Sequence, residues 1–133
     1  MTRILLYSDF QPGISSNVDD KYLSLLNGTK YRIGYIPSAS DSSRRYFAKV
    51  KDQYKNLGIN NVGYFDLGEE YDPDAMAKLF DCDAIHLSGG DPFNFLYLIR
   101  NRRFAEPLRK YIQSGGLLVG ISAGAMILTR TLA

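Results

Sequence analysis

The chain alternates short apolar runs with stretches in which apolar residues recur at helical spacing. The apolar runs, which have the length of buried β-strands, cover residues 4–7, 31–36, 62–67, 84–87 and 117–119. An amphipathic stretch follows each run. This alternation is typical of α/β proteins, so we predict a doubly wound, mostly parallel sheet with helices on both faces.

Capping residues mark where several of these helices begin. Asp72-Pro73 and Asp91-Pro92 each place a carboxylate directly before a proline at the first helical position. Ser40 or Asp41 can cap a long helix that ends near Gly58.

The composition fits one small α/β domain, which we assign to residues 1–133. Of the 133 residues, 45% are apolar, which is enough for one sizeable hydrophobic core. The net charge is +2, from 16 basic and 14 acidic residues, and this balance argues against nucleic acid or a membrane as the main partner. Five basic residues are expected on the solvated face of one helix: Arg44, Arg45, Lys49, Lys51 and Lys55.

Cysteine usage and hydropathy favour a reducing compartment. Cys82 is the single cysteine of the sequence, which excludes a disulfide within the chain and a cysteine-based metal cluster. Neither a secretory leader nor an apolar run of about 18 residues is found. We therefore expect a cytoplasmic protein.

The end of the sequence carries the strongest chemical signal. Gly120-Ile121-Ser122-Ala123-Gly124 follows the apolar run 117–119 and precedes the apolar residues of a helix. A Gly-x-Ser-x-Gly between a strand and a helix is typical of a nucleophile elbow, a tight turn that exposes the serine hydroxyl above the sheet. We predict that Ser122 is a nucleophile. The alternative is a tight turn in which the hydroxyl only caps the helix.

A glycine pair, Gly89-Gly90, follows the fourth predicted strand. Acyl transfer needs two N–H donors for the developing oxyanion, one from the residue after the nucleophile, here Ala123, and one from a neighbouring loop. We assign the second donor to Gly90 and the turn to Gly89, because glycine lets a backbone approach the substrate closely. The alternative is a simple glycine turn before the helix that Asp91 caps.

Three loops rich in small residues follow predicted strands. They are Pro37–Ser40, Ser88–Asp91 and the elbow itself. Ligands of open parallel sheets bind beyond the carboxyl ends of the strands, near the point where the strand order reverses. We therefore expect these loops to converge on one site.

No histidine is placed to act as the base. His86, the single histidine, lies before Gly90 in the fourth strand, and at about 3.3 Å per residue it is roughly 13 Å from that loop. General bases work at hydrogen-bond distance, so we expect a buried, neutral histidine with a satisfied partner. Asp41 and Asp91 are expected to cap helices, and Asp9 is a further carboxylate at the predicted site.

Together these motifs resemble peptidase E, the aspartyl dipeptidases of the S51 serine peptidases, a family that also includes the cyanophycinases. The matching segments are residues 35–40, 85–93 and 120–125. They occur in the family's order and at compatible spacing over essentially the whole chain. One departure is Asp91, where family members often have asparagine.

The resemblance implies a class I glutamine amidotransferase-like fold, a flavodoxin-like three-layer sandwich, with serine in place of the cysteine nucleophile. It implies a cytoplasmic exopeptidase that cleaves dipeptides with an N-terminal aspartate and uses no metal and no cofactor. Ser122 corresponds to the family's nucleophile, and Gly90 and Ala123 correspond to its oxyanion hole. Gly89 and Asp91 are then expected beside the small peptide substrate.

Similar proteins are longer, and their catalytic histidine, its acidic partner and their aspartate-binding residues follow the elbow helix. The resemblance therefore implies either a truncated member, with little turnover as a lone enzyme, or a chain whose remainder is supplied by something else. The alternative is a catalytically silent binding or assembly module. An ordinary α/β-hydrolase esterase ranks last, because that fold usually opens with antiparallel strands.

The short C-terminus also leads us to expect a homodimer. Ending at Ala133 should leave a strand edge uncovered, together with an apolar helix face that includes parts of Met126, Ile127 and Leu128. Exposed strand edges and large apolar patches favour pairing with a second chain.

Overall fold

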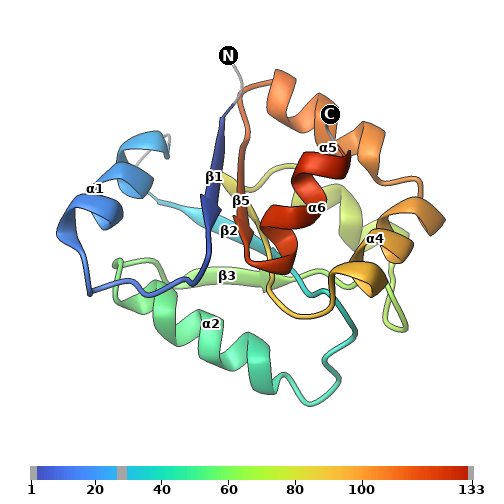
Figure 1. Ribbon diagram of the computed structural model, residues 1–133, viewed down its shortest axis with the longest axis horizontal. Coiled ribbons are helices and arrows are strands. Elements are labelled where there is room, and N and C mark those ends of the chain that lie inside the picture. Colours follow the sequence, from blue (N-terminus) through green and yellow to red (C-terminus); the bar gives the residue numbers. More distant parts are fainter. Residues whose placement is uncertain (1–2, 27–29, 132–133) are drawn as a thin grey trace.

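The structure, a computed structural model, describes residues 3–26 and 30–131 of the chain. Within these residues one sheet is formed by β1 (Ile4–Tyr7), β2 (Arg32–Ile36), β3 (Asn61–Tyr64), β4 (Ala84–Leu87) and β5 (Leu117–Ile121). The strands are all parallel and lie in the order β1-β5-β4-β2-β3 (Figure 1). β4 is therefore the central strand.

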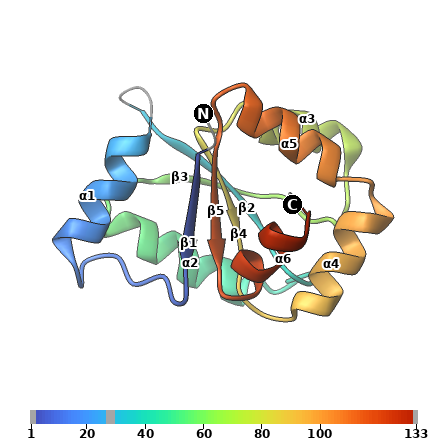
Figure 2. The same cartoon turned by 45° about the horizontal axis from the view of Figure 1, so that its top comes forward.

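Helices cover both faces of the sheet. α1 (Ser16–Leu25) and α2 (Arg45–Lys55) lie on one face. The other face carries α3 (Pro73–Leu79), α4 (Pro92–Asn101), α5 (Ala105–Gln113) and α6 (Ala123–Thr131) (Figure 2). This arrangement confirms the predicted doubly wound α/β fold.

The chain reverses its direction across the sheet after β3. The connections from β1 to β2 and from β2 to β3 run toward one edge, and those from β3 to β4 and from β4 to β5 run back. Because such crossovers are right-handed, the reversal moves the later helices to the opposite face. The loops after β2 and β4 therefore leave in opposite directions, and the gap between them is where ligands bind in such sheets.

Each face of the sheet has its own core. Leu79, Leu87 and Leu118 are fully buried on the side of α3 to α6. On the side of α1 and α2 the core is largely aromatic, and it contains Tyr22 and Tyr54. Both strand faces are thus covered by helices, which explains why the strands appear in the sequence as continuous apolar runs.

One expectation about uncovered surface is wrong in part. The uncovered strand edge does not belong to β5, which pairs with β1 on one side and with β4 on the other, but β1 beside it is an edge strand in the described sheet. Ile127 and Leu128 are 2% and 3% exposed, because α6 packs against β5 and α4. Met126 is exposed, as expected. The homodimer stays a prediction, but of the three helix residues offered in its support only Met126 is exposed.

Three polar side chains form a chain of hydrogen bonds inside the aromatic core. The hydroxyls of Tyr22 and Tyr54 are 2.7 Å apart, and the Tyr54 hydroxyl is 2.7 Å from Nδ1 of His86. Each of these residues is at most 1% exposed. Burial lowers the pKa of His86 to about 3, so the ring is neutral at physiological pH. His86 is thus the buried histidine with a satisfied partner that its position in the strand predicted.

Protonation of His86 should couple to unfolding. Below a pH of about 6.5 the imidazole of the unfolded chain binds a proton, whereas the folded chain, with its pKa of about 3, does not. This contribution to stability is therefore fully present above about pH 7 and should fall by about 2 kcal/mol between pH 7 and pH 5. Urea denaturation at several pH values measures the free energy of unfolding and its dependence on pH. His86→Gln keeps a hydrogen-bonding side chain that cannot titrate, so its stability should vary much less over this range. An equal loss in both proteins would contradict the assignment.

Candidate active site

Ser122 lies in the turn between β5 and α6, at the carboxyl end of the sheet. Its φ of 49° is left-handed, a conformation that costs a non-glycine residue about 1–3 kcal/mol. The Ser122 N–H donates to the carbonyl of Tyr7 (2.8 Å), and the Met126 N–H donates to the carbonyl of Ser122 (3.0 Å). The residue is exposed. Ser122 thus occupies the strained, exposed turn that the elbow pattern predicts, and its role as the nucleophile stays a prediction.

Two glycines of the elbow allow α6 to pack tightly on the ends of β4 and β5. A Cβ on Gly124 would overlap the carbonyl of Leu87, and a Cβ on Gly120 would lie 2.9 Å from the backbone nitrogen of Ala125. Neither position accepts a side chain unless the backbone moves. The Gly-x-Ser-x-Gly spacing therefore has a packing reason in addition to the turn.

The loop Ser88–Asp91 lies beside the elbow. The Gly124 N–H donates to the Ser88 carbonyl at 3.1 Å, and a Cβ on Gly89 would be 3.7 Å from the Cβ of Ser122. Gly90 has a φ of 123°, which is accessible to glycine and to few other residues. The glycine-dependent turn is therefore made at Gly90, whereas the sequence analysis assigned it to Gly89.

The two predicted oxyanion donors are both available. Among residues 3–26 and 30–131, neither the Gly90 N–H nor the Ala123 N–H has a hydrogen-bond acceptor. Ala123 is the first residue of α6, so its N–H lies at the positive end of the helix dipole. The loops that carry both groups leave neighbouring parallel strands at the same sheet edge. The arrangement is compatible with anion binding beside Ser122, and the oxyanion role stays a prediction.

Ser38 holds the glycine loop from the side of β2. Its N–H donates to Oγ of Ser88 (2.8 Å), and its carbonyl accepts from Nδ2 of Asn94 (2.7 Å). The Ser88 hydroxyl in turn donates to the carbonyl of Gly89 (2.9 Å). These bonds join the loops after β2 and β4 to the start of α4. Sequence reasoning missed them, because a serine in a loop of small residues does not indicate its partner.

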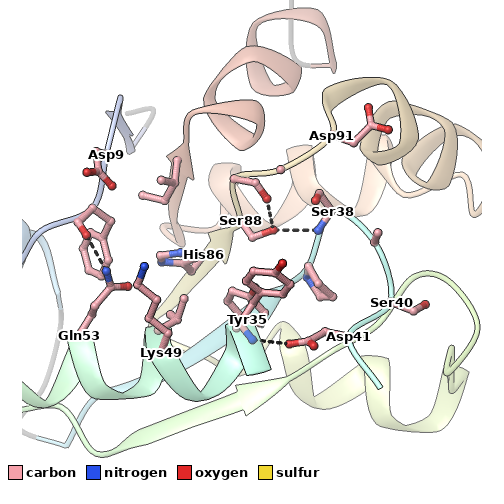
Figure 3. A pocket seen from close by; sticks show the side chains of 18 residues that line it. Asp9, Tyr35, Ser38, Ser40, Asp41, Lys49, Gln53, His86, Ser88 and Asp91 are labelled. Atoms are coloured by element: carbon pink, nitrogen blue, oxygen red, sulfur yellow. Dashed lines mark hydrogen bonds between the residues drawn. The ribbon is translucent and has the colours of Figure 1, made fainter. Parts of the chain in front are cut away.

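A pocket of about 450 Å³ opens beside the elbow, at the switch point between β2 and β4 (Figure 3). Its walls are the loops after β1, β2 and β4 together with one face of α2. The buried side chains of Tyr35 and His86 also line it, and it extends to Ile121, the residue before Ser122. The loops after β2 and β4 thus converge, as expected.

Two carboxylates at this pocket cap helices. Oδ2 of Asp41 accepts from the N–H groups of Tyr46 and Phe47, at 3.0 Å each. Oδ1 of Asp91 accepts from two N–H groups in the first turn of α4, at 2.9 and 3.2 Å. Both capping predictions are confirmed. The substrate contacts expected of Asp91 and Gly89 stay predictions.

Lys49 is a pocket residue that the sequence analysis missed. It shares one face of α2 with Tyr46, Val50 and Gln53, and all four residues line the pocket. In the part of the chain that the structure describes, its ammonium has no ion-pair or hydrogen-bond partner. Lys49 is exposed, as its place on the solvated helix face predicted, but helical spacing carries no information about a cavity beside that face.

A base for Ser122 is not found among the described residues. No side chain there hydrogen-bonds to the Ser122 hydroxyl, and Nδ1 of His86 is bonded to Tyr54 inside the core. The described residues also contain no group of three His, Cys, Asp or Glu side chains that could hold a metal ion. None of their helices combines the length and apolarity that crossing a bilayer requires.

Comparison with known sequences finds one matching peptidase family, and relatives named cyanophycinase and peptidase E. The family model of peptidase family S51 matches residues 5–133. The cyanophycinase of Synechococcus elongatus is 31% identical over 100 residues, which cover 72% of this chain and 31% of that protein. Peptidase E of Streptomyces coelicolor is 29% identical over 93 residues, which cover 70% of this chain and 36% of that protein.

A solved structure shares the fold. A protein of Listeria monocytogenes EGD-e, proposed to be a peptidase E, matches this chain with a TM-score of 0.75 and 25% identity. The match covers 96% of this chain and 62% of the Listeria protein, so the chain spans only part of the length of these relatives. The family match includes both the glycine loop and the elbow, and the chain belongs to peptidase family S51.

Proposed function

We propose that this chain supplies the nucleophile and the oxyanion donors of a serine peptidase that cleaves small peptides, in particular dipeptides with an N-terminal aspartate. One observation carries the proposal. Ser122 is exposed at a φ of 49° between β5 and α6, beside a glycine loop. The substrate class follows from the resemblance to peptidase E.

In the proposed reaction, Oγ of Ser122 attacks the scissile carbonyl carbon and its proton passes to a base. The carbonyl oxygen becomes an oxyanion, which the N–H groups of Gly90 and Ala123 stabilise. The C–N bond of the tetrahedral intermediate then breaks, the leaving amine takes up the proton, and an acyl ester remains on Ser122. Water hydrolyses this ester through the same donors.

His86 is not the base in this proposal. Its Nδ1 is engaged by Tyr54, and burial lowers its pKa to about 3, which removes its basicity at neutral pH. A general base needs a pKa near the working pH and a place within hydrogen-bond distance of the proton that it takes. Another group therefore has to accept the proton of Ser122.

A catalytically silent binding or assembly module is the second candidate function. The same histidine favours it, because the sequence contains one histidine and the structure buries it in the core. Such a module would keep the pocket and the elbow without turnover. The two candidates differ in whether Ser122 reacts.

Ser122 should react with a fluorophosphonate probe, which forms a covalent adduct with nucleophilic serines. The strained turn and the N-terminus of α6 both favour attack by its hydroxyl. Peptide mapping by mass spectrometry should find one adduct, on Ser122. The adduct should be lost in Ser122→Ala and kept in Ser24→Ala, which removes another exposed serine. The absence of an adduct, or one that survives Ser122→Ala, would favour the silent module.

Gly90→Ala should slow this labelling by roughly a hundredfold, the usual effect of removing one oxyanion donor. The new methyl group would overlap the Ser38 hydroxyl, and the φ of 123° is strained for any residue but glycine, so the Gly90 N–H should move. Gly115→Ala is the matched control, because Gly115 also has a positive φ, 100°, and a Cβ there would have no atom within 4 Å. The measurement is the labelling rate of each variant, after circular dichroism has shown that the variant is folded. Equal rates in the two variants would contradict the donor role of Gly90.

Turnover by this chain alone should be negligible. Since His86 is not available as a base, Asp-Leu should be hydrolysed no faster than by Ser122→Ala, as loss of one triad member costs several orders of magnitude. Chromatographic detection of released leucine measures the rate. Robust turnover that depends on Ser122 would reveal a base within this chain and would exclude the silent module.

A further inference from the structure

The Gly89–Gly90 peptide group lies between two fixed points of the loop after β4. Before it, the Ser88 N–H donates to the carbonyl of Ile36 at 3.0 Å, and the Ser88 carbonyl accepts an N–H from the first turn of α6 at 3.1 Å. After it, Asp91 caps α4. A glycine pair can adopt many backbone conformations at little steric cost. The pair therefore leaves the direction of the peptide group between the two fixed points open, unless a side chain determines it.

The side chain of Ser88 holds this peptide group. Its hydroxyl donates to the carbonyl of Gly89 at 2.9 Å and accepts the N–H of Ser38 at 2.8 Å (Figure 3). A carbonyl oxygen can only accept, so the single hydrogen of the hydroxyl is directed at Gly89. Tyr35 also hydrogen-bonds to Ser88, and burial raises the pKa of the Tyr35 hydroxyl to about 12, so this hydroxyl keeps its hydrogen and can donate it to Ser88.

The bond to the Gly89 carbonyl also determines where the Gly90 N–H points, because both belong to one peptide group. This group is trans, and in a planar trans peptide the C=O and the N–H point in opposite directions. Since the carbonyl is turned toward the Ser88 hydroxyl, the N–H points away from it. Among residues 3–26 and 30–131 the Gly90 N–H has no acceptor. Ser88 is 6% exposed, so water competes little for its hydroxyl.

We propose that Ser88 is a positioning residue, whose hydroxyl turns the Gly90 N–H toward the oxyanion at the elbow. The inference rests on the proposed function in one respect, namely that the Gly90 N–H is an oxyanion donor. Such a donor is most effective when its direction is set before the reaction. The glycine pair lets the backbone approach the substrate, and Ser88 fixes the direction that the pair alone would leave open. Ser88 thus acts through Gly90.

The direction of the Gly90 N–H can be measured in the unreacted chain by the residual dipolar coupling of its amide. Ser88→Ala removes the hydroxyl and should change this coupling or average it toward zero, because the peptide group can then turn. Ser88→Thr keeps a hydroxyl and should restore the coupling of the parent chain. Circular dichroism shows whether each variant is folded.

Ser38→Ala is the matched control for this measurement. Ser38 is 7% exposed, against 6% for Ser88, so the two substitutions remove hydroxyls of similar burial. Ser38 bonds to Ser88 through its main-chain N–H, which the substitution keeps. The Gly90 coupling should therefore be nearly the same in Ser38→Ala as in the parent chain. An equal change in Ser38→Ala and Ser88→Ala would overturn the specific role of Ser88.

The reactivity of Ser122 gives a second readout. Loss of one neutral hydrogen bond shifts an equilibrium about two- to tenfold, so Ser88→Ala should slow fluorophosphonate labelling by about that factor, less than Gly90→Ala does. In the labelled chain the phosphoryl oxygen takes the place of the oxyanion, and the Gly90 amide proton should move downfield. This shift should be smaller in Ser88→Ala. The shift of the Ala123 amide should be kept, because Ala123 belongs to α6. An equal loss at both amides would overturn the role of Ser88.

Failure of the proposed function gives a different result from failure of this inference. If Ser122 in the parent chain is not labelled, the oxyanion role on which the inference rests is removed, even where the couplings show that Ser88 orients the peptide group. If Ser122 is labelled but Ser88→Ala reacts as fast as the parent chain, the nucleophile stands and the positioning role of Ser88 is overturned. An unchanged Gly90 coupling in Ser88→Ala overturns that role as well, whatever the labelling rate.

Discussion

The close approach of α6 to the end of β4 is the constraint on which the site depends. Gly124 makes it possible, because any Cβ there would overlap the carbonyl of Leu87. The Gly124 N–H then donates to the Ser88 carbonyl at 3.1 Å. Parallel pairing of Leu87 with Gly120 already brings the two strand ends level. Register and one glycine contact together bring the elbow and the glycine loop next to each other, with the Gly90 and Ala123 N–H groups at the same sheet edge.

The doubly wound topology places the elbow helix and the pocket on different faces of the sheet. The helix that follows Ser122 lies on one face of the sheet, and the pocket is built largely on the other face, against α2. The reversal of strand order between β2 and β4 opens the space between them. The elbow helix and the pocket therefore lie on different faces of the sheet and meet at the carboxyl ends of its strands.

Local patterns predicted most of the fold, and tertiary contacts account for the differences. The apolar runs located all the strands of the described sheet, but β3 ends at Tyr64 and not at Leu67. The reason is Asp66, whose carboxylate accepts the N–H groups of Gly68 (2.9 Å) and Glu70 (3.0 Å) and turns the chain. The long helix begins at Arg45, yet Asp41 caps it from across a turn.

The same distinction applies to the site. Ser122 and Asp91 could be located because turns and caps have local signatures in the sequence. The same signature placed the glycine turn one residue early, at Gly89 instead of Gly90. Lys49 could not be located, since its place at the pocket depends on the position of α2 between two loops that are distant in sequence. The bonds that Ser38 makes to the glycine loop likewise join segments from different strands.

Electrostatics explain why the buried histidine beside the pocket is not a base. An imidazolium in the core would carry a positive charge with a large desolvation cost, and burial prevents this by lowering the pKa of His86 to about 3. The Tyr54 hydroxyl, 2.7 Å from Nδ1, holds the neutral ring in its orientation. His86 therefore gives the pocket an uncharged wall of fixed orientation, and it cannot serve as the proton acceptor of the elbow.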